Sequence, residues 1–92
     1  MAQPMVIVFM MSGCGACEEY WPRFESLAKP FYDHRSLPIQ VYNVNQAQAL
    51  AKKHGVQYTP TTIVQDRNGT ITKHEGAISS AEILGALQAA LR

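Results

Sequence analysis

Residues 5–22 read Met5-Val-Ile-Val-Phe-Met-Met-Ser-Gly-Cys14-Gly-Ala-Cys17-Glu-Glu-Tyr-Trp21-Pro22. The unbroken apolar run over residues 5–10 predicts a central strand that is covered on both faces. After Ser12-Gly13, apolar residues recur at steps of three and four, which predicts one face of an amphipathic helix. That face comprises Cys17, Tyr20, Trp21, Phe24, Leu27, Ala28 and Phe31. We therefore expect Cys17 to be buried and Cys14, at the entrance of the helix, to be accessible.

Two prolines bear on the length of this helix. Pro22 removes the amide that would bond to the carbonyl of Glu18, so we expect a kink there. We expect Pro30 and the polar segment 33–36 to end the helix.

The next segments predict a second strand, a short helix and a third strand. Alternation over residues 38–44 indicates a strand. Asn45 is expected to cap a helix over residues 46–54, with Gly55 as its C-terminal stop. The β-branched residues 61–65 indicate the third strand.

The last third of the chain predicts a hairpin and a helix. Asp66-Arg-Asn-Gly69 is a turn signal, and residues 70–74 form the returning strand. Ser79-x-x-Glu82 predicts a capping box. The buried stripe of the last helix is expected to comprise Ile83, Leu84, Leu87 and Leu91.

These elements follow the order β-α-β-α-β-β-α. The first β-α-β unit must be a parallel crossover, and the hairpin must be antiparallel. The predicted fold class is therefore α/β, with a four-stranded mixed sheet and helices on both faces.

Length and charge restrict the function classes. The 92 residues predict one domain over 1–92, and a net charge of +1 with scattered Lys and Arg points to neither nucleic acid nor a membrane surface. The start Met-Ala-Gln-Pro lacks the positive residues of a signal peptide, so we expect a cytoplasmic protein. We also expect it to be a monomer. In a reducing compartment, two cysteines spaced C-x-x-C favour redox or metal chemistry over a structural bridge.

The thiol chemistry depends on Cys14 losing its proton. Only a thiolate attacks a disulfide, and the amides of Gly15 and Ala16 at the positive end of a helix dipole favour a charged sulfur. Glu18 and Glu19 place negative charge within one turn and oppose this effect. We therefore expect a real but moderate lowering of the pKa of Cys14.

Taken together, these motifs resemble the thioredoxin family over most of the chain. The resemblance includes the strand-turn-C-x-x-C-helix unit, Pro22 eight residues after Cys14, Gly55-Val-Gln-Tyr-Thr-Pro60-Thr, the Asn68-Gly69 hairpin and Gly76-Ala-Ile-Ser79. It implies a thioredoxin-like fold.

The chain also departs from the family pattern. Only thirteen residues precede Cys14, so we expect the family's first strand and helix to be missing. Gly13 stands where a tryptophan is usual. The dipeptide between the cysteines is Gly-Ala, where the family has Gly-Pro. Glu18 stands where a basic residue often follows the second cysteine. Val8 replaces a buried aspartate, so we expect Cys17 to attack slowly, using water or a nearby carboxylate such as Glu18.

The resemblance implies roles for particular residues. Cys14 would be the nucleophile and Cys17 the resolving thiol of a protein-disulfide reductase, supported by Gly13, Gly15, Ala16 and Pro22. The Thr59–Pro60 bond would be cis and would expose the Thr59 backbone to an extended substrate. Tyr58, Val44, Gly76 and Ala77 would line the substrate groove. Glu75 would favour basic partners.

No cofactor is implied beyond a redox-active Cys14–Cys17 disulfide. Electrons would come from a thioredoxin-reductase-like enzyme or from glutathione, and the partners would be proteins with disulfides. A zinc site is disfavoured because His34, His54 and His74 lack ligand spacing. A dimer sharing a metal or an iron–sulfur cluster stays open.

Two further alternatives remain. A glutaredoxin-like enzyme using glutathione fits the short length, but the chain lacks an aromatic residue between the cysteines and a Gly-Gly-x-x-Asp segment. A non-catalytic adaptor would keep the fold without the chemistry.

Overall fold

The apolar run at the start of the chain forms the central strand β1, Met5–Met10. In the computed structural model, which describes residues 2–92, β1 pairs in parallel with β2 (Ile39–Asn43) and antiparallel with β3 (Thr61–Gln65). The strand β4 (Ile71–Glu75) pairs antiparallel with β3 and completes a sheet of order β2-β1-β3-β4. The predicted fold class is confirmed, as are the parallel pairing of the first two strands and the antiparallel pairing of the last two.

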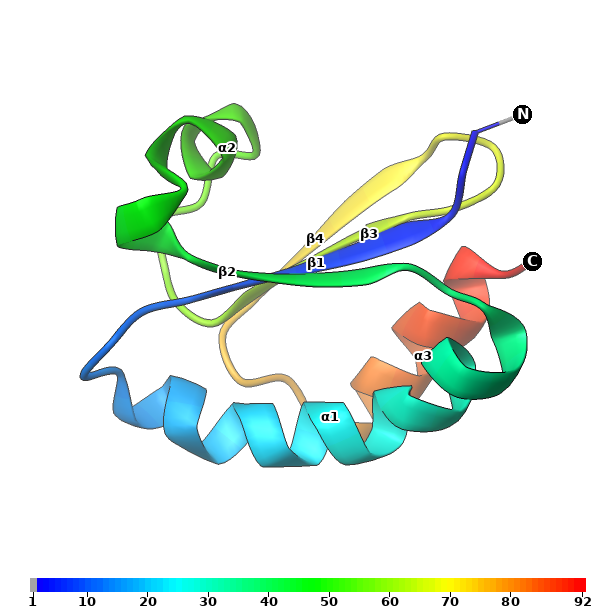
Figure 1. The fold of residues 1–92 in the computed structure, drawn as a ribbon, viewed down its shortest axis with the longest axis horizontal. Helices are drawn as coiled ribbons and strands as arrows, with labels where there is room; N and C mark the ends of the chain where they lie inside the picture. Colours follow the sequence, from blue (N-terminus) through cyan, green and yellow to red (C-terminus); the bar gives the residue numbers. More distant parts are fainter. Residues whose placement is uncertain (1) are drawn as a thin grey trace.

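Helices cover both faces of this sheet (Figure 1). The long helix α1, Gly15–Arg35, and the last helix α3, Ser80–Ala90, lie on one face. The short 3₁₀ turn η1, Val44–Gln46, and the helix α2, Gln48–Lys53, lie on the other. Among residues 2–92, no helix combines the length and the apolar character needed to cross a membrane.

Alternation along β1 sends its side chains into two separate cores. Val6 and Val8 pack under α1 and α3, whereas Ile7 and Phe9 pack under α2. All four are at most 4% exposed. This two-sided burial explains why the strand is apolar throughout.

The larger core contains one buried polar pair. Tyr20 and Thr62 are almost fully buried, and their hydroxyls lie 2.7 Å apart in a hydrogen bond. Burial raises the pKa of Tyr20, and the hydrogen bond to Thr62 partly offsets this. The bond satisfies two polar groups that would otherwise be costly to bury.

Several predicted element ends need correction. Pro30 does not end α1: the helix continues to Arg35 and stops at Ser36, which adopts a left-handed conformation (φ 54°) and donates its N–H to the Phe31 carbonyl. Asn45 is not a cap. The side chain of Asn43 accepts the Asn45 N–H at 2.9 Å instead, and the regular part of α2 begins only at Gln48.

The last helix is confirmed, with a different buried stripe. Its fully buried residues are Ile83, Ala86, Leu87 and Ala90. Leu84 and Leu91 are only half-buried. The prediction considered only large apolar residues and therefore missed the two buried alanines.

The predicted capping box at the start of α3 is present. Ser79 Oγ accepts the Glu82 N–H at 3.1 Å, and the Glu82 carboxylate accepts the Ser79 N–H at 3.2 Å. These hydrogen bonds, first the one from the Ser79 backbone, lower the pKa of Glu82.

The lowered pKa of Glu82 predicts an acid-sensitive contribution to stability. A folded-state pKa below the unfolded value stabilises the protein above the unfolded pKa, and this contribution is lost as pH falls through the folded pKa. Urea unfolding should therefore show a Glu82→Gln variant less stable than the parent at pH 7, with the difference vanishing in acid. A difference that grew towards low pH would contradict the assignment.

Candidate functional site

The turn between β1 and α1 positions the first cysteine. Gly13 has φ +76°, a conformation that favours glycine. Cys14 is the N-cap of α1, and its Sγ accepts the Cys17 N–H at 3.1 Å. A sulfur here therefore occupies the place where a serine or aspartate oxygen normally caps a helix.

The two cysteines form a disulfide, with their Cα atoms 5.2 Å apart. Cys17 is 5% exposed, whereas Cys14 is only half-buried, as the helical spacing predicts. Gly15 and Ala16, between them, are exposed. One sulfur of the pair is therefore more accessible to a partner than the other.

Thr59 reaches the sulfur of Cys14 from 45 residues away. Its Oγ1 donates to Cys14 Sγ at 3.4 Å, and its carbonyl oxygen lies 3.5 Å from the same sulfur. The Thr59–Pro60 peptide bond is cis, the isomer that the resemblance implies. Gly76 N–H donates to the Pro60 carbonyl at 2.8 Å. Three connecting segments therefore meet at one end of the sheet.

The structure also places the other residues that the resemblance assigns to the substrate groove. Tyr58 is 62% exposed, so it does not pack in the core, and its carbonyl accepts the Thr61 hydroxyl at 2.6 Å. Ala77 is exposed beside Gly76. Val44 packs with the cluster under α2.

A groove of about 490 Å³ beside the disulfide contains residues that sequence reasoning assigned elsewhere or overlooked. Trp21, expected in the core, is half-buried and stacks on Phe24 while also lining this groove. Met11 is 41% exposed and lines it too, as does Glu18. Its position as a large apolar residue directly before the Ser12-Gly13 turn could have identified Met11 as a groove residue.

Metal ligands do not gather anywhere in residues 2–92: no group of three or more His, Cys, Asp or Glu side chains lies close enough to share an ion.

Removing the Thr59 hydroxyl should make Cys14 less acidic. After reduction, this hydroxyl and the Cys17 N–H would both donate to a Cys14 thiolate, and hydrogen bonds to charged groups are the stronger kind. We expect Thr59→Val to raise the pH midpoint of Cys14 alkylation by up to about one unit. The measurement is the rate of iodoacetamide labelling against pH. Thr72→Val, at an exposed position on β4, is the control, and an equal shift in both variants would contradict the role of Thr59.

A dithiol–disulfide pair at a helix start, opposite a cis-proline on a mixed sheet of this order, defines the thioredoxin class of redox fold. The family model "Thioredoxin" matches residues 1–89. The chain is 30% identical over 87 residues to a thioredoxin-like protein of Synechocystis, covering 94% of this chain and 77% of that protein. The chain belongs to the thioredoxin family.

Other similarities agree with this assignment. The chain is 30% identical over 88 residues to chloroplastic thioredoxin F-type of Spinacia oleracea, covering 96% of this chain and 45% of that one. It thus spans about half the length of that relative. The crystal structure of the germline-specific thioredoxin Deadhead of Drosophila melanogaster superimposes with a TM-score of 0.80 at 20% identity, covering 94% of this chain and 79% of that one. Mitochondrial thioredoxin 3 of Saccharomyces cerevisiae gives 0.77 at 24% identity, covering 96% and 80%.

Proposed function

We propose that this protein is a thiol–disulfide oxidoreductase that reduces disulfides in other proteins. The observation that carries the proposal is the Cys14–Cys17 disulfide at the start of α1, with Thr59 in contact with the more accessible sulfur. Family membership supports the same reaction class. We also propose that it acts as a monomer in the cytoplasm, where the reduced form can be regenerated.

The proposed cycle consists of two exchanges. The Cys14 thiolate attacks one sulfur of the substrate disulfide, forming a mixed disulfide and releasing the other substrate sulfur as a thiolate. Cys17 then loses its proton and attacks Cys14 Sγ, which releases the second substrate thiolate. Two electrons pass to the substrate, and Cys14–Cys17 becomes oxidised. A thioredoxin-reductase-like enzyme or glutathione would supply the next two electrons.

The second exchange should be the slower one. Cys17 is 5% exposed, and burial disfavours a thiolate. Val8, where the family has an acid, is fully buried. The proton of Cys17 would therefore pass to water or to Glu18, which lines the same groove.

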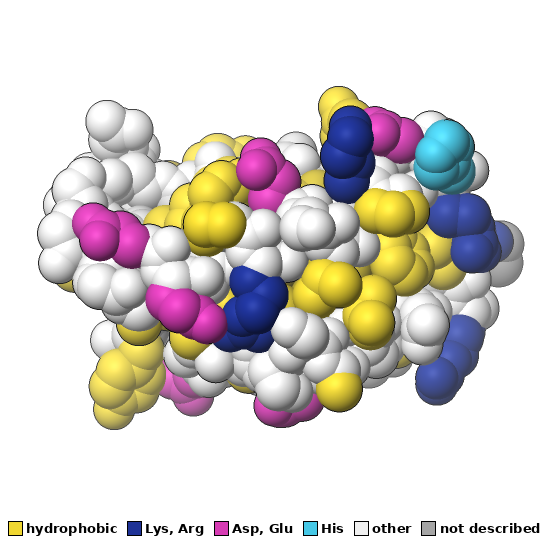
Figure 2. Space-filling model, turned by 90° about the horizontal axis from the view of Figure 1, so that it is seen from below, with side chains coloured by type: hydrophobic (Ala, Val, Ile, Leu, Met, Phe, Trp, Pro, Cys, Tyr) yellow, Lys and Arg dark blue, Asp and Glu magenta, His cyan; other side chains and the backbone are white. Residues whose placement is uncertain are grey.

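The charges around the site favour a basic partner. Glu75 pairs with Thr61 in the β3–β4 register, and Thr61 directly follows Pro60. Glu18 directly follows Cys17. Figure 2 shows carboxylates at the end of the molecule where α1 begins, whereas the basic side chains lie towards the centre and the opposite end. Such a field accelerates encounter with a positively charged surface.

The test is a redox titration with alkylation of free thiols, run beside an insulin-disulfide reduction assay. We expect a single two-electron transition and catalysed reduction. If the protein reduced a glutathione mixed disulfide with glutathione but left insulin unreduced, the glutaredoxin-like alternative would replace this proposal. If the protein reduced neither insulin nor the glutathione mixed disulfide, the non-catalytic adaptor would be the remaining alternative.

A further inference from the structure

The two edge strands of the sheet differ in how they are protected. On one side β4 carries Lys73 and Glu75, charges of the kind that keep edge strands from pairing with other chains. On the other side β2 reads Ile-Gln-Val-Tyr-Asn and has neither a charged residue nor a proline. Figure 1 shows β2 in front of β1 with no other element beyond it. The outward N–H and C=O groups of β2 are therefore available to another strand.

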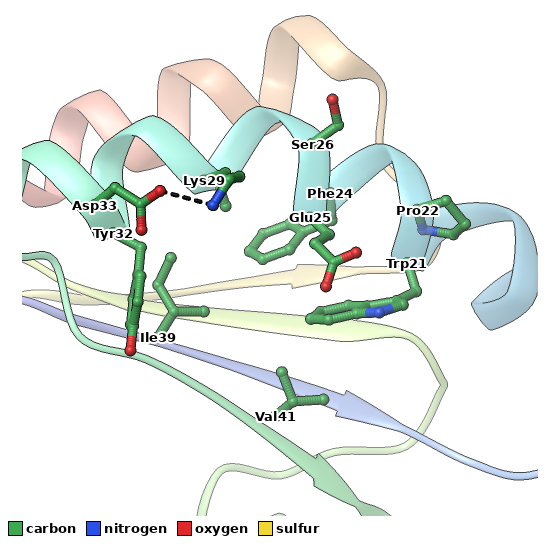
Figure 3. A pocket seen from close by; sticks show the side chains of 11 residues that line it. Trp21, Pro22, Phe24, Glu25, Ser26, Lys29, Tyr32, Asp33, Ile39 and Val41 are labelled. Atoms are coloured by element: carbon green, nitrogen blue, oxygen red, sulfur yellow. Dashed lines mark hydrogen bonds and ion pairs between the residues drawn. The ribbon is translucent and has the colours of Figure 1, made fainter.

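A groove of about 610 Å³ lies between this edge and α1. Its lining is mostly apolar; its charged members are Glu25, Lys29 and Asp33, of which the last two form an ion pair. Figure 3 shows the Trp21 ring lying between the helix and the strands, with Val41 below it and Tyr32 beside Ile39. Val41 is 40% exposed and Tyr32 is 60% exposed. Apolar side chains on a strand added to β2 could thus be buried against α1.

This groove continues to the disulfide. It shares Trp21, Pro22 and Val41 with the second groove, which extends to Met11 and Cys17. We name the two together the β2 trough. At the end of the trough near Cys17, Asn43 Nδ2 donates to Ser12 Oγ at 3.2 Å. This hydrogen bond joins the end of β2 to the turn before Cys14.

We propose that the β2 trough binds an extended, uncharged, β-forming segment of the protein whose disulfide is reduced. The segment adds to β2 as a fifth strand; main-chain hydrogen bonds provide affinity, and its alternate apolar side chains enter the trough. This docking role rests on the proposed function. It differs from the groove at Thr59 because it lies on the opposite side of β1.

Ordinary strand spacing is compatible with one substrate occupying both places, because Cys14 follows β1 in the sequence after only three residues. A strand added to β2 lies two strand spacings, about 10 Å, from β1, and three extended residues span about 10 Å. The continuity of the trough with Cys17 favours the substrate as occupant. If a second copy of the chain paired at this edge instead, it would block the route to the disulfide in both copies.

Two peptide disulfides provide the test. Both carry the same cystine and a three-residue spacer; one continues as Val-Thr-Val-Thr-Val and the other as Gly-Ser-Gly-Ser-Gly. We expect the KM of the Val-Thr peptide to be about five- to tenfold lower. Val41→Lys and Val41→Glu should both abolish this difference. Ile71→Lys, on the opposite edge and at a residue 52% exposed, should keep it.

A small aromatic disulfide, dithionitrobenzoate, separates the possible failures. Equal turnover of this compound by all four proteins shows that folding and redox chemistry are intact. With that activity present, equal KM values for the two peptides, or a preference that survives both Val41 variants, would overturn the docking role alone. Absence of that activity in the parent would overturn the proposed function and the docking role with it. A dimer in sedimentation that Val41→Lys dissociates would assign the edge to a second copy and overturn the proposal.

Discussion

Replacing Cys14 by serine is expected to abolish disulfide reduction, whereas replacing Cys17 by serine should stop the cycle after its first half. The more accessible sulfur, in contact with Thr59, makes the first attack, and the buried one is needed only for release. A serine hydroxyl cannot form the mixed disulfide. Cys17→Ser should therefore accumulate a covalent complex with an insulin-type substrate, and Cys14→Ser should accumulate none.

Non-reducing electrophoresis followed by mass spectrometry of the adduct measures this directly. The double variant Cys14→Ser/Cys17→Ser is the control for non-covalent association. Adducts that form equally at either cysteine would contradict the assigned order of attack. Unchanged partner affinity and biological effect in Cys14→Ser would support an adaptor instead.

The largest expected effect on stability follows from replacing Phe24 by alanine. Phe24 is 1% exposed at the centre of the core under α1, where it contacts Tyr20 and Trp21 in aromatic pairs. Removing a buried phenylalanine ring costs about 3–5 kcal/mol. Because small domains have a free energy of unfolding of about 5–15 kcal/mol, this variant should lose a large fraction of its stability and unfold at a much lower urea concentration.

Tyr32→Ala provides a matched control. It removes an aromatic ring from the same helix at a position that is 60% exposed, where substitutions usually change stability by less than about 0.5 kcal/mol. Urea unfolding followed by circular dichroism compares the two variants. Similar losses in both would mean that α1 does not bury the face that includes Phe24.

Patterns within single segments were the reliable part of the sequence analysis. The run over residues 5–10, the strand 61–65 and the Ser79–Glu82 capping box were each predicted from neighbouring residues and are confirmed. Local patterns failed where two neighbouring residues compete for one task. Asn43 and Asn45 can both cap a turn, and only the path of the chain decides between them.

Other features could not be predicted because they depend on tertiary contacts. Pro30 stays inside α1, so proline alone did not mark the end of that helix. The contact between Thr59 and Cys14 joins residues 45 positions apart, and it involves a hydroxyl that the resemblance did not single out. The exposure of Val41 depends on β2 having no neighbour on its outer side.

The same Thr59 contact makes the acidity of Cys14 a report on whether the loop before β3 is in place. A helix start by itself provides backbone amides, but the hydroxyl reaches Cys14 only when the loop before β3 lies against the start of α1. Partial unfolding around residue 59 would return the thiol towards ordinary reactivity while α1 stayed intact. The rate of thiol labelling could therefore follow the opening of this loop under conditions in which helix content does not change.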